Sequence, residues 1–136
     1  MAKFSIDLSK YVANAMGNVD DVVRKAALEI FSKIILSSPV DTGRFRANWV
    51  TTTDSPNRST NEGFDKLGEM AIEQATVTLA TAKAGQVIYL ANNLPYAQRL
   101  ENGWSKQSRP NAMVALNVMN FQAAVDRAVA ETKAAP

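Results

Sequence analysis

The stretch that decides the fold is Gln86-Val87-Ile88-Tyr89-Leu90-Ala91-Asn92-Asn93-Leu94-Pro95-Tyr96-Ala97-Gln98-Arg99-Leu100-Glu101-Asn102-Gly103. Its first seven residues are rich in β-branched and aromatic side chains and follow the turn residues Ala84-Gly85, so they predict a strand over 86–92. Pro95 suits the first position of a helix and Gly103 suits its end, which predicts a short helix over 96–101. The stretch therefore predicts a rigid corner, in which a strand passes directly into a helical turn.

A second strand is predicted upstream of this corner. Between residues 45 and 53 apolar and polar side chains alternate, and the end of the segment is rich in threonine, which favours a strand with one buried face. A turn over 40–43 precedes it. A uniformly polar loop over 54–63 follows, and a loop of this kind is usually functional or disordered. We expect this loop to become ordered when it docks to a neighbouring molecule.

Three longer segments carry helical patterns. Apolar residues recur every three or four positions over 8–35 and again over 111–133, and Gly17-Asn18 predicts a bend or a fresh start in the first of these helices. Residues 64–83 favour a helix, although the alternation over 75–79 also allows a strand. The last residues, 134–136, are expected to be frayed. The apolar stripes comprise Val12, Met16, Val19, Val23, Ala26, Ile30 and Ile34 in the first helix and Val114, Val118, Phe121, Val125 and Ala128 in the last, while Leu67, Met70, Ala71, Gln74, Val77 and Thr78 lie on overlapping faces of the second.

Together these patterns predict an α+β fold in a single domain spanning 1–136. A small, mainly antiparallel sheet would be packed by a long N-terminal helix and a C-terminal helix. With 136 residues, of which 46% are hydrophobic, the chain is long enough to form a substantial core.

The composition excludes several kinds of catalytic and metal-binding site. The chain has no cysteine and no histidine, which excludes disulfides, thiolate nucleophiles, Cys/His zinc sites and an imidazole base. We expect no cofactor and no bound metal. No apolar run approaches the ~20 residues that cross a bilayer, and the N-terminus lacks the apolar core of a secretory signal, so we expect a cytoplasmic protein without a membrane partner. The net charge of +2 is too small to indicate nucleic-acid binding by itself.

One string matches an enzyme signature. Asp41-Thr42-Gly43 is the tripeptide in which aspartic proteases place their paired carboxylates, and a homodimer could supply the pair. The residues on either side of this string do not fit a protease, because Ser38-Pro39 and Arg44 stand where the apolar strand residues would bury the protease loop. The favoured interpretation is a turn in which Asp41 is the capping side chain and Gly43 adopts a conformation closed to other residues.

Basic and aromatic residues offer candidates for contact surfaces. If the turn at Asp41 lay near the segment after Gly103, a basic rim could face DNA; the simpler alternative is a solvated surface with ion pairs such as Arg99 with Glu101 or Asp41. Trp49 and Trp104 suit a core position, but Trp104 follows a glycine in a polar loop and could be buried against a neighbouring subunit. The residues of the possible basic rim are Arg44, Arg46, Arg99, Lys106 and Arg109.

Two strings together resemble a known family. Pro39-Val40-Asp41-Thr42-Gly43-Arg44-Phe45-Arg46-Ala47-Asn48-Trp49 is similar to the N-terminal hallmark of a neck protein family of long-tailed bacteriophages. The segment 87–107 is similar to its second hallmark. Members are called head–tail connector, tail-completion or minor tail proteins. One departure is Pro110-Asn111-Ala112-Met113, where the family tends to have glycine in place of Ala112; Asn111 can cap the following helix instead.

The resemblance implies a non-enzymatic structural protein of the virion, assembled in the cytoplasm of the host bacterium. Its copies would form a ring, sixfold in this family, around the DNA channel between the portal or adaptor proteins and the tail tube, with only non-specific contact to DNA. A tail terminator that caps the tube is one alternative, and a small DNA-binding protein is another. The candidate interface residues are Asp41, Arg44, Arg46, Trp49, Asn93, Tyr96, Arg99, Glu101, Trp104 and Lys106.

Overall fold

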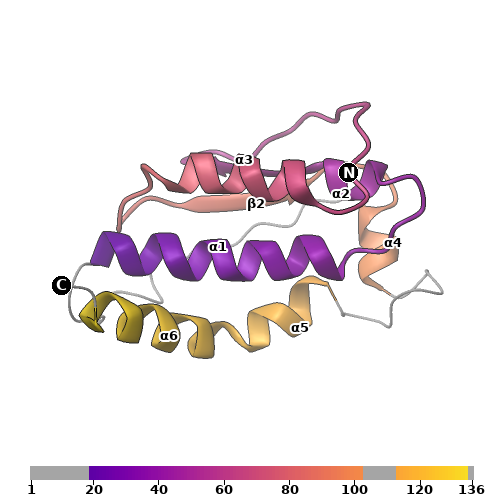
Figure 1. Ribbon diagram of the computed structural model, residues 1–136. Coiled ribbons are helices and arrows are strands. Elements are labelled where there is room, and N and C mark those ends of the chain that lie inside the picture. The colour runs from indigo at the N-terminus through magenta and orange to yellow at the C-terminus, as the bar shows by residue number, and fades with distance from the viewer. Residues whose placement is uncertain (1–18, 103–112, 135–136) are drawn as a thin grey trace.

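A computed structural model describes residues 19–102 and 113–134 of the chain. Figure 1 shows three layers, with α1 in the middle, α3 and the strands on one side, and α5 and α6 on the other. The elements in chain order are α1 (Val19–Ser37), α2 (Arg44–Ala47), β1 (Trp49–Thr53), α3 (Glu69–Leu79), β2 (Ile88–Asn92), α4 (Ala97–Glu101), α5 (Val114–Met119) and α6 (Phe121–Ala134). The predicted α+β class is confirmed, because the described helices accompany a two-stranded antiparallel sheet.

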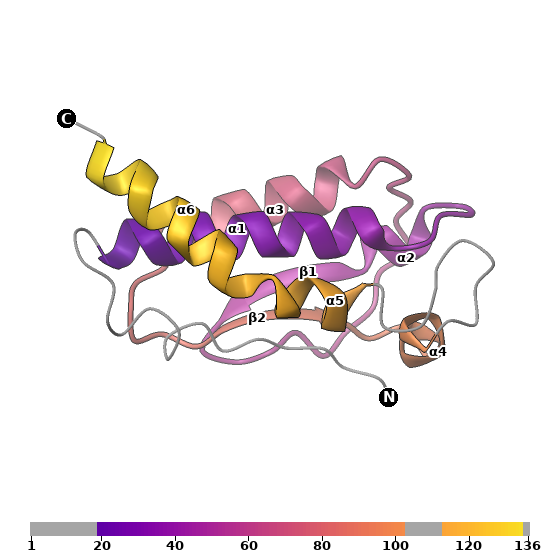
Figure 2. The same cartoon turned by 90° about the horizontal axis from the view of Figure 1, so that it is seen from below.

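The central helix α1 is buried on more of its surface than the sequence predicts. It packs against α3, α5 and α6, and the turned view in Figure 2 shows α6 crossing it. A helix held between two layers needs apolar residues on both sides, so a second apolar row lies beside the predicted one. Residues 8–18 of the predicted helix lie outside the described ranges. The buried residues of α1 are Val22, Val23, Ala26, Ala27, Ile30, Phe31, Ile34 and Ile35.

The predicted strand over 45–53 is wrong in its first part, because residues 44–47 form the helical turn α2. Gly43 has a φ of 91°, and its carbonyl oxygen accepts hydrogen bonds from the backbone N–H of Ala47 at 3.1 Å and of Asp65 at 2.9 Å. The side chain of Asn48 donates to the carbonyl of Arg44 at 2.8 Å and closes the turn. The strand therefore begins only at Trp49.

The two strands have the predicted antiparallel arrangement. Trp49 pairs with Asn92 and Thr53 with Ile88, so β2 is close to the predicted strand over 86–92. The outer edge of β1 is covered by a side chain of α3: Gln74 Nε2 donates to the carbonyl of Thr51 at 2.7 Å, and Gln74 Oε1 accepts from the Thr51 N–H at 2.9 Å. One glutamine amide thus takes the place of a third strand at this position.

Helix α3 is confirmed as a helix through 75–79, but it begins at Glu69 rather than at 64. The preceding Gly68 has a φ of 77°, a left-handed conformation that separates α3 from the loop before it. The predicted faces of this helix are wrong in part. The buried residues of α3 are Ala71, Ala75 and Leu79, whereas Leu67, Met70 and Val77 are exposed.

The C-terminal segment forms two helices rather than the single predicted one. The break falls at Asn120, whose backbone N–H donates to Asn117 and whose side chain donates to the carbonyl of Leu116. Asparagine side chains that bond nearby carbonyls compete with the helical pattern. The buried positions Phe121, Val125 and Ala128 match the predicted stripe. Residues 111–112 and 135–136 lie outside the described ranges.

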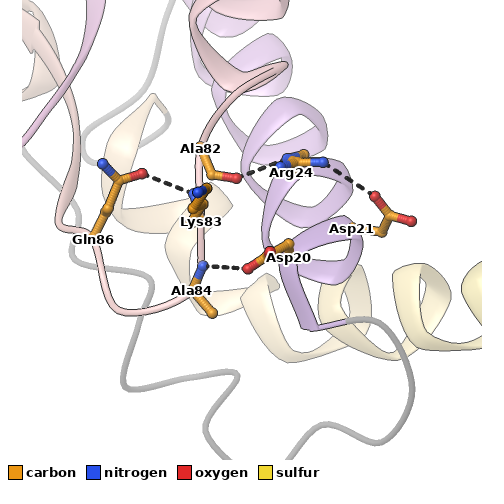
Figure 3. Close-up of polar contacts among 7 residues, drawn as sticks. All are labelled: Asp20, Asp21, Arg24, Ala82, Lys83, Ala84 and Gln86. Atoms are coloured by element: carbon orange, nitrogen blue, oxygen red, sulfur yellow. Dashed lines mark hydrogen bonds and ion pairs between the residues drawn. The ribbon is translucent and has the colours of Figure 1, made fainter.

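A polar contact at the other end of the molecule ties α1 to the turn before β2. Arg24 Nε donates to the carbonyl of Ala82 at 2.7 Å, and Asp20 Oδ1 accepts from the N–H of Ala84 at 2.8 Å (Figure 3). The side chain of Gln86 closes the turn by accepting from the N–H of Lys83. These bonds fix the direction in which the chain enters β2. Among the helices of the described ranges, none combines the length and apolar character that a membrane span requires.

Candidate functional site

The two segments that carry the family resemblance meet at one corner of the molecule. Trp49 and Asn92 are register partners in the sheet, and Asn92 Nδ2 donates to the carbonyl of Phe45 at 2.9 Å. The ring of Phe45 lies 5.7 Å from that of Trp49 and 5.9 Å from that of Tyr96. We call residues 39–49 and 92–101 the α2–α4 corner. Figure 1 shows α2 and α4 at the end of the molecule where α1 finishes.

A depression of about 230 Å³ lies on the outside of this corner. Its apolar lining comes from both segments, and Asp41 and Arg44 add the charged groups. A depression of this composition can receive an apolar side chain of another molecule, with polar groups at its border. Its lining residues are Pro39, Val40, Asp41, Thr42, Gly43, Arg44, Phe45, Tyr96 and Leu100.

The turn that shapes the depression depends on Gly43. A Cβ atom at this position would lie 2.6 Å from the backbone nitrogen of Lys66 and 2.7 Å from that of Asp65. The prediction that Gly43 adopts a conformation closed to other residues is therefore confirmed. The hydroxyl of Thr42 accepts the N–H of Arg44 at 3.3 Å, whereas the predicted capping residue, Asp41, is exposed.

The side chain of Arg46 binds groups of its own subunit. Its guanidinium donates to the carbonyls of Leu36 at 2.8 Å, Ser38 at 3.1 Å and Lys66 at 2.8 Å. Leu36 and Ser38 are at the C-terminal end of α1, where carbonyls lack helical partners and a cation is favourable. Partial burial lowers the pKa of Arg46, and the charge of Asp65 opposes this shift.

Trp49 also faces inward. Its side chain is buried in the core, and its indole N–H donates to the hydroxyl of Ser38 at 2.7 Å. The same hydroxyl donates to the carbonyl of Ile34 at 3.0 Å. Trp49 therefore anchors the corner to the end of α1.

Arg44 is the basic residue of the depression. It forms an ion pair with Glu62 over 3.6 Å, and the two side chains are 38% and 90% exposed. An ion pair this exposed contributes little to stability. Arg44 Nε has no hydrogen-bond partner within the part of the chain that the structure describes. Nε itself is buried, but the side chain is partly exposed and held by a weak ion pair, so its end could be recruited by a partner's carboxylate.

Asn93 holds the polar loop over 54–63. Its side-chain amide donates to the carbonyls of Asn57 at 2.8 Å and Ser59 at 3.2 Å. Asn48 secures the other end, because its Oδ1 accepts from the N–H of Asn61 at 2.8 Å. The expectation that this loop becomes ordered only on docking is wrong, since the subunit itself supplies the contacts that hold it.

Glu101 connects α4 to α5. Its Oε1 accepts from the N–H of Met113 at 3.1 Å and of Val114 at 3.0 Å, and its Oε2 accepts from the N–H of Ala115 at 2.9 Å. A carboxylate in this position satisfies the amides at the start of a helix, which have no partner within the helix itself. The described cap of α5 is therefore Glu101; Asn111, the predicted cap, lies outside the described residues.

The exposed residues of the predicted interface are Asp41, Tyr96 and Arg99, with Arg44 partly exposed. Trp104, Lys106 and Arg109 lie outside the described residues, so the proximity of the two halves of the basic rim stays a prediction. Within the described ranges no group of three acidic side chains is placed to hold a metal ion.

Sequence reasoning missed Ser38 and Gln74, whose side chains hold the corner and the sheet edge. Neither residue type signals its role, because each binds a group in another element: Ser38 binds Trp49 of β1, and Gln74 binds Thr51.

Comparison of the chain with known protein families, with curated proteins and with solved structures found no match. The case for a function rests on the two sequence motifs and on the geometry of the corner that they form.

Proposed function

We propose that the chain is a neck subunit of a long-tailed bacteriophage, which assembles into a ring that joins the DNA-filled head to the tail. Its neighbours would be the portal or adaptor proteins on one side and the tail terminator or tail tube on the other. Its contact with DNA in the channel would be non-specific. A tail terminator would use the same kind of ring and is the nearest alternative.

The observation that carries this proposal is the convergence of the two motif segments. They are separated by about forty residues of sequence, yet Phe45 packs on Tyr96 and Trp49 pairs with Asn92. A chance similarity in two separate strings would not require their residues to build one surface. This convergence supports the view that the motifs describe a single structural element.

The contacts within the corner also suit a structural protein whose function depends on a rigid surface. Arg46, Trp49, Asn93 and Glu101 bind carbonyls, a hydroxyl or backbone amides of their own subunit. They fix the positions of α2 and α4, and Tyr96 and the depression are left facing outward. A rigid surface of this kind loses little conformational entropy on association.

The proposal is tested by supplying variants to a phage whose own copy of the gene is inactivated. Tyr96 is 38% exposed, so Tyr96→Ala should remove contact area and leave the subunit folded. We expect free heads and free tails to accumulate, counted by electron microscopy, with complete particles reduced at least tenfold. Phe64→Ala is the matched control, because Phe64 is an exposed aromatic residue in the segment between β1 and α3.

Normal yields of complete particles with Tyr96→Ala would contradict the interface role of the corner. DNA binding by the free subunit that falls steeply with salt, together with absence of the protein from particles, would favour the small DNA-binding protein instead.

A further inference from the structure

The outer side of α3 is an exposed face with both apolar and acidic residues. Met70 is 63% exposed and Val77 is 68% exposed. Glu73 lies between them at helical spacing, so the three side chains share one side of the helix, and Glu69 is exposed in the first turn. We call Glu69, Met70, Glu73 and Val77 the α3 outer face. Large apolar side chains are seldom grouped on a free surface without a partner.

The apolar area continues past the start of α3. Leu67 is 68% exposed and Leu36 is 50% exposed. Leu36 lies beside the residue that precedes α3, because a Cβ atom on Gly68 would lie 3.4 Å from Leu36 Cδ2.

A symmetric pairing of this face with itself is unfavourable. A twofold contact can place the two copies of α3 antiparallel, so that Met70 faces Val77, or parallel, so that each residue faces its own copy. In both arrangements Glu73 lies near its own copy, where two like charges repel. The partner of the α3 outer face must instead carry a cation and an apolar recess.

The α2–α4 corner has both properties. Its depression is lined by the apolar side chains of Val40, Phe45 and Leu100, and it lies beside Tyr96. Arg99 is exposed on α4, one helical turn beyond Tyr96. Figures 1 and 2 both place α4 at one end of the molecule and α3 along its side, so the two surfaces are different faces. Two different complementary faces are what a head-to-tail contact requires.

We propose that the α3 outer face of one subunit docks on the α2–α4 corner of the next copy, with Met70 in the depression and Glu73 opposite Arg99. The unbranched, polarisable side chain of methionine adapts well to an irregular recess. This inference rests on the proposed function, because it assigns the two faces by which the ring would close. It makes Glu73 and Arg99 a charge pair that sets the register between neighbours.

Cross-linking tests the contact directly, since the chain has no cysteine of its own. Glu73→Cys and Arg99→Cys are introduced together, and purified particles that contain this variant are treated with a short bis-maleimide reagent. We expect a ladder of covalently joined subunits on a denaturing gel. The control pair joins Glu73→Cys with Asp126→Cys on the exposed side of α6, and it should remain monomeric.

A charge exchange provides the second measurement. Glu73→Arg and Arg99→Glu should each reduce complete particles at least tenfold, and the double variant should recover most of that loss. Asp126→Arg, an equal charge reversal at an exposed position, should have no effect. Circular dichroism of each purified variant shows that the subunit is folded.

If particles contain the double-cysteine protein but give no ladder, this contact is wrong, although the proposal of a ring is not contradicted. Single reversals that join heads to tails normally, or a folded double variant that recovers nothing, would also overturn this contact. A protein that is absent from particles altogether would overturn the proposed function, and this inference with it.

Discussion

Glu101 shows how a single side chain can determine the shape of the corner. It projects from α4, yet its two oxygens accept three backbone N–H groups at the start of α5. On the sequence alone, Glu101 suggests an ion pair with Arg99 or contact with a neighbour. In the structure its carboxylate instead binds backbone amides of its own subunit, and these bonds fix where α5 begins.

Replacing Glu101 with alanine should therefore destabilise the protein. Three amides would lose a charged acceptor at a buried position, and we expect the free energy of unfolding to fall by about 3 kcal/mol. Urea titration followed by circular dichroism measures this change. Gln98→Ala, on an exposed position of the same helix, should cost less than about 0.5 kcal/mol. Equal losses for the two variants would show that the carboxylate does not hold α5.

Arg46 illustrates why charge in a sequence is a poor guide to a binding surface. It belongs to the predicted basic rim, but its guanidinium donates to carbonyls at the end of α1 and to Lys66. The favourable position for a cation at a helix C-terminus explains this placement. Among the described residues of that rim, Arg99 is exposed and Arg44 is partly exposed, and both are candidates for contact with another molecule.

At the scale of elements, the sheet depends on α3 for the outer edge of β1. Gln74→Leu should keep the helix but leave the N–H and carbonyl of Thr51 without their partners. We expect a loss of about 2 kcal/mol in the free energy of unfolding and faster hydrogen exchange at the Thr51 amide. Nuclear magnetic resonance measures that exchange residue by residue.

Gln122→Leu serves as the control for this prediction, because Gln122 is an exposed glutamine on α6 whose side chain bonds only its neighbour Asp126 among the described residues. It should leave both stability and Thr51 exchange unchanged. An unchanged Thr51 amide in Gln74→Leu would mean that the edge of β1 is protected by something other than this side chain.

The elements that could be predicted from the sequence are those with local signals. The strand β2 combines β-branched residues with flanking turn residues, and α4 follows a proline, so the local pattern predicts the bounds of both to within two residues. The helical spacing of Val23, Ala26 and Ile30 likewise identified α1.

The elements that could not be predicted depend on contacts between distant segments. The helical turn α2 depends on the Gly43 carbonyl, which accepts hydrogen bonds from the N–H groups of Ala47 and Asp65. The alternation of apolar and polar residues around Phe45 predicts a strand there instead. The sequence pattern misplaces the exposed side of α3, because the small residues Ala71 and Ala75 form much of its buried face. Close packing of a helix on a strand favours small residues, which a search for large apolar side chains overlooks.

At the scale of the whole molecule, the layers around α1 place two unlike surfaces on different faces. The α2–α4 corner contains a depression and carries Arg99, while the α3 outer face carries exposed apolar residues with Glu69 and Glu73. A molecule with unlike, complementary faces forms closed rings when the rotation between neighbours divides a full turn. This arrangement supports a role that depends on assembly geometry.

The most direct test of this role counts the protein in purified virions of the phage that encodes it, by quantitative mass spectrometry against labelled peptides. The account predicts a small, fixed number of copies in each particle, six if the ring matches the resembled family, and the same number in rings released from the particles. Complete, infectious virions that contain none of this protein would contradict it.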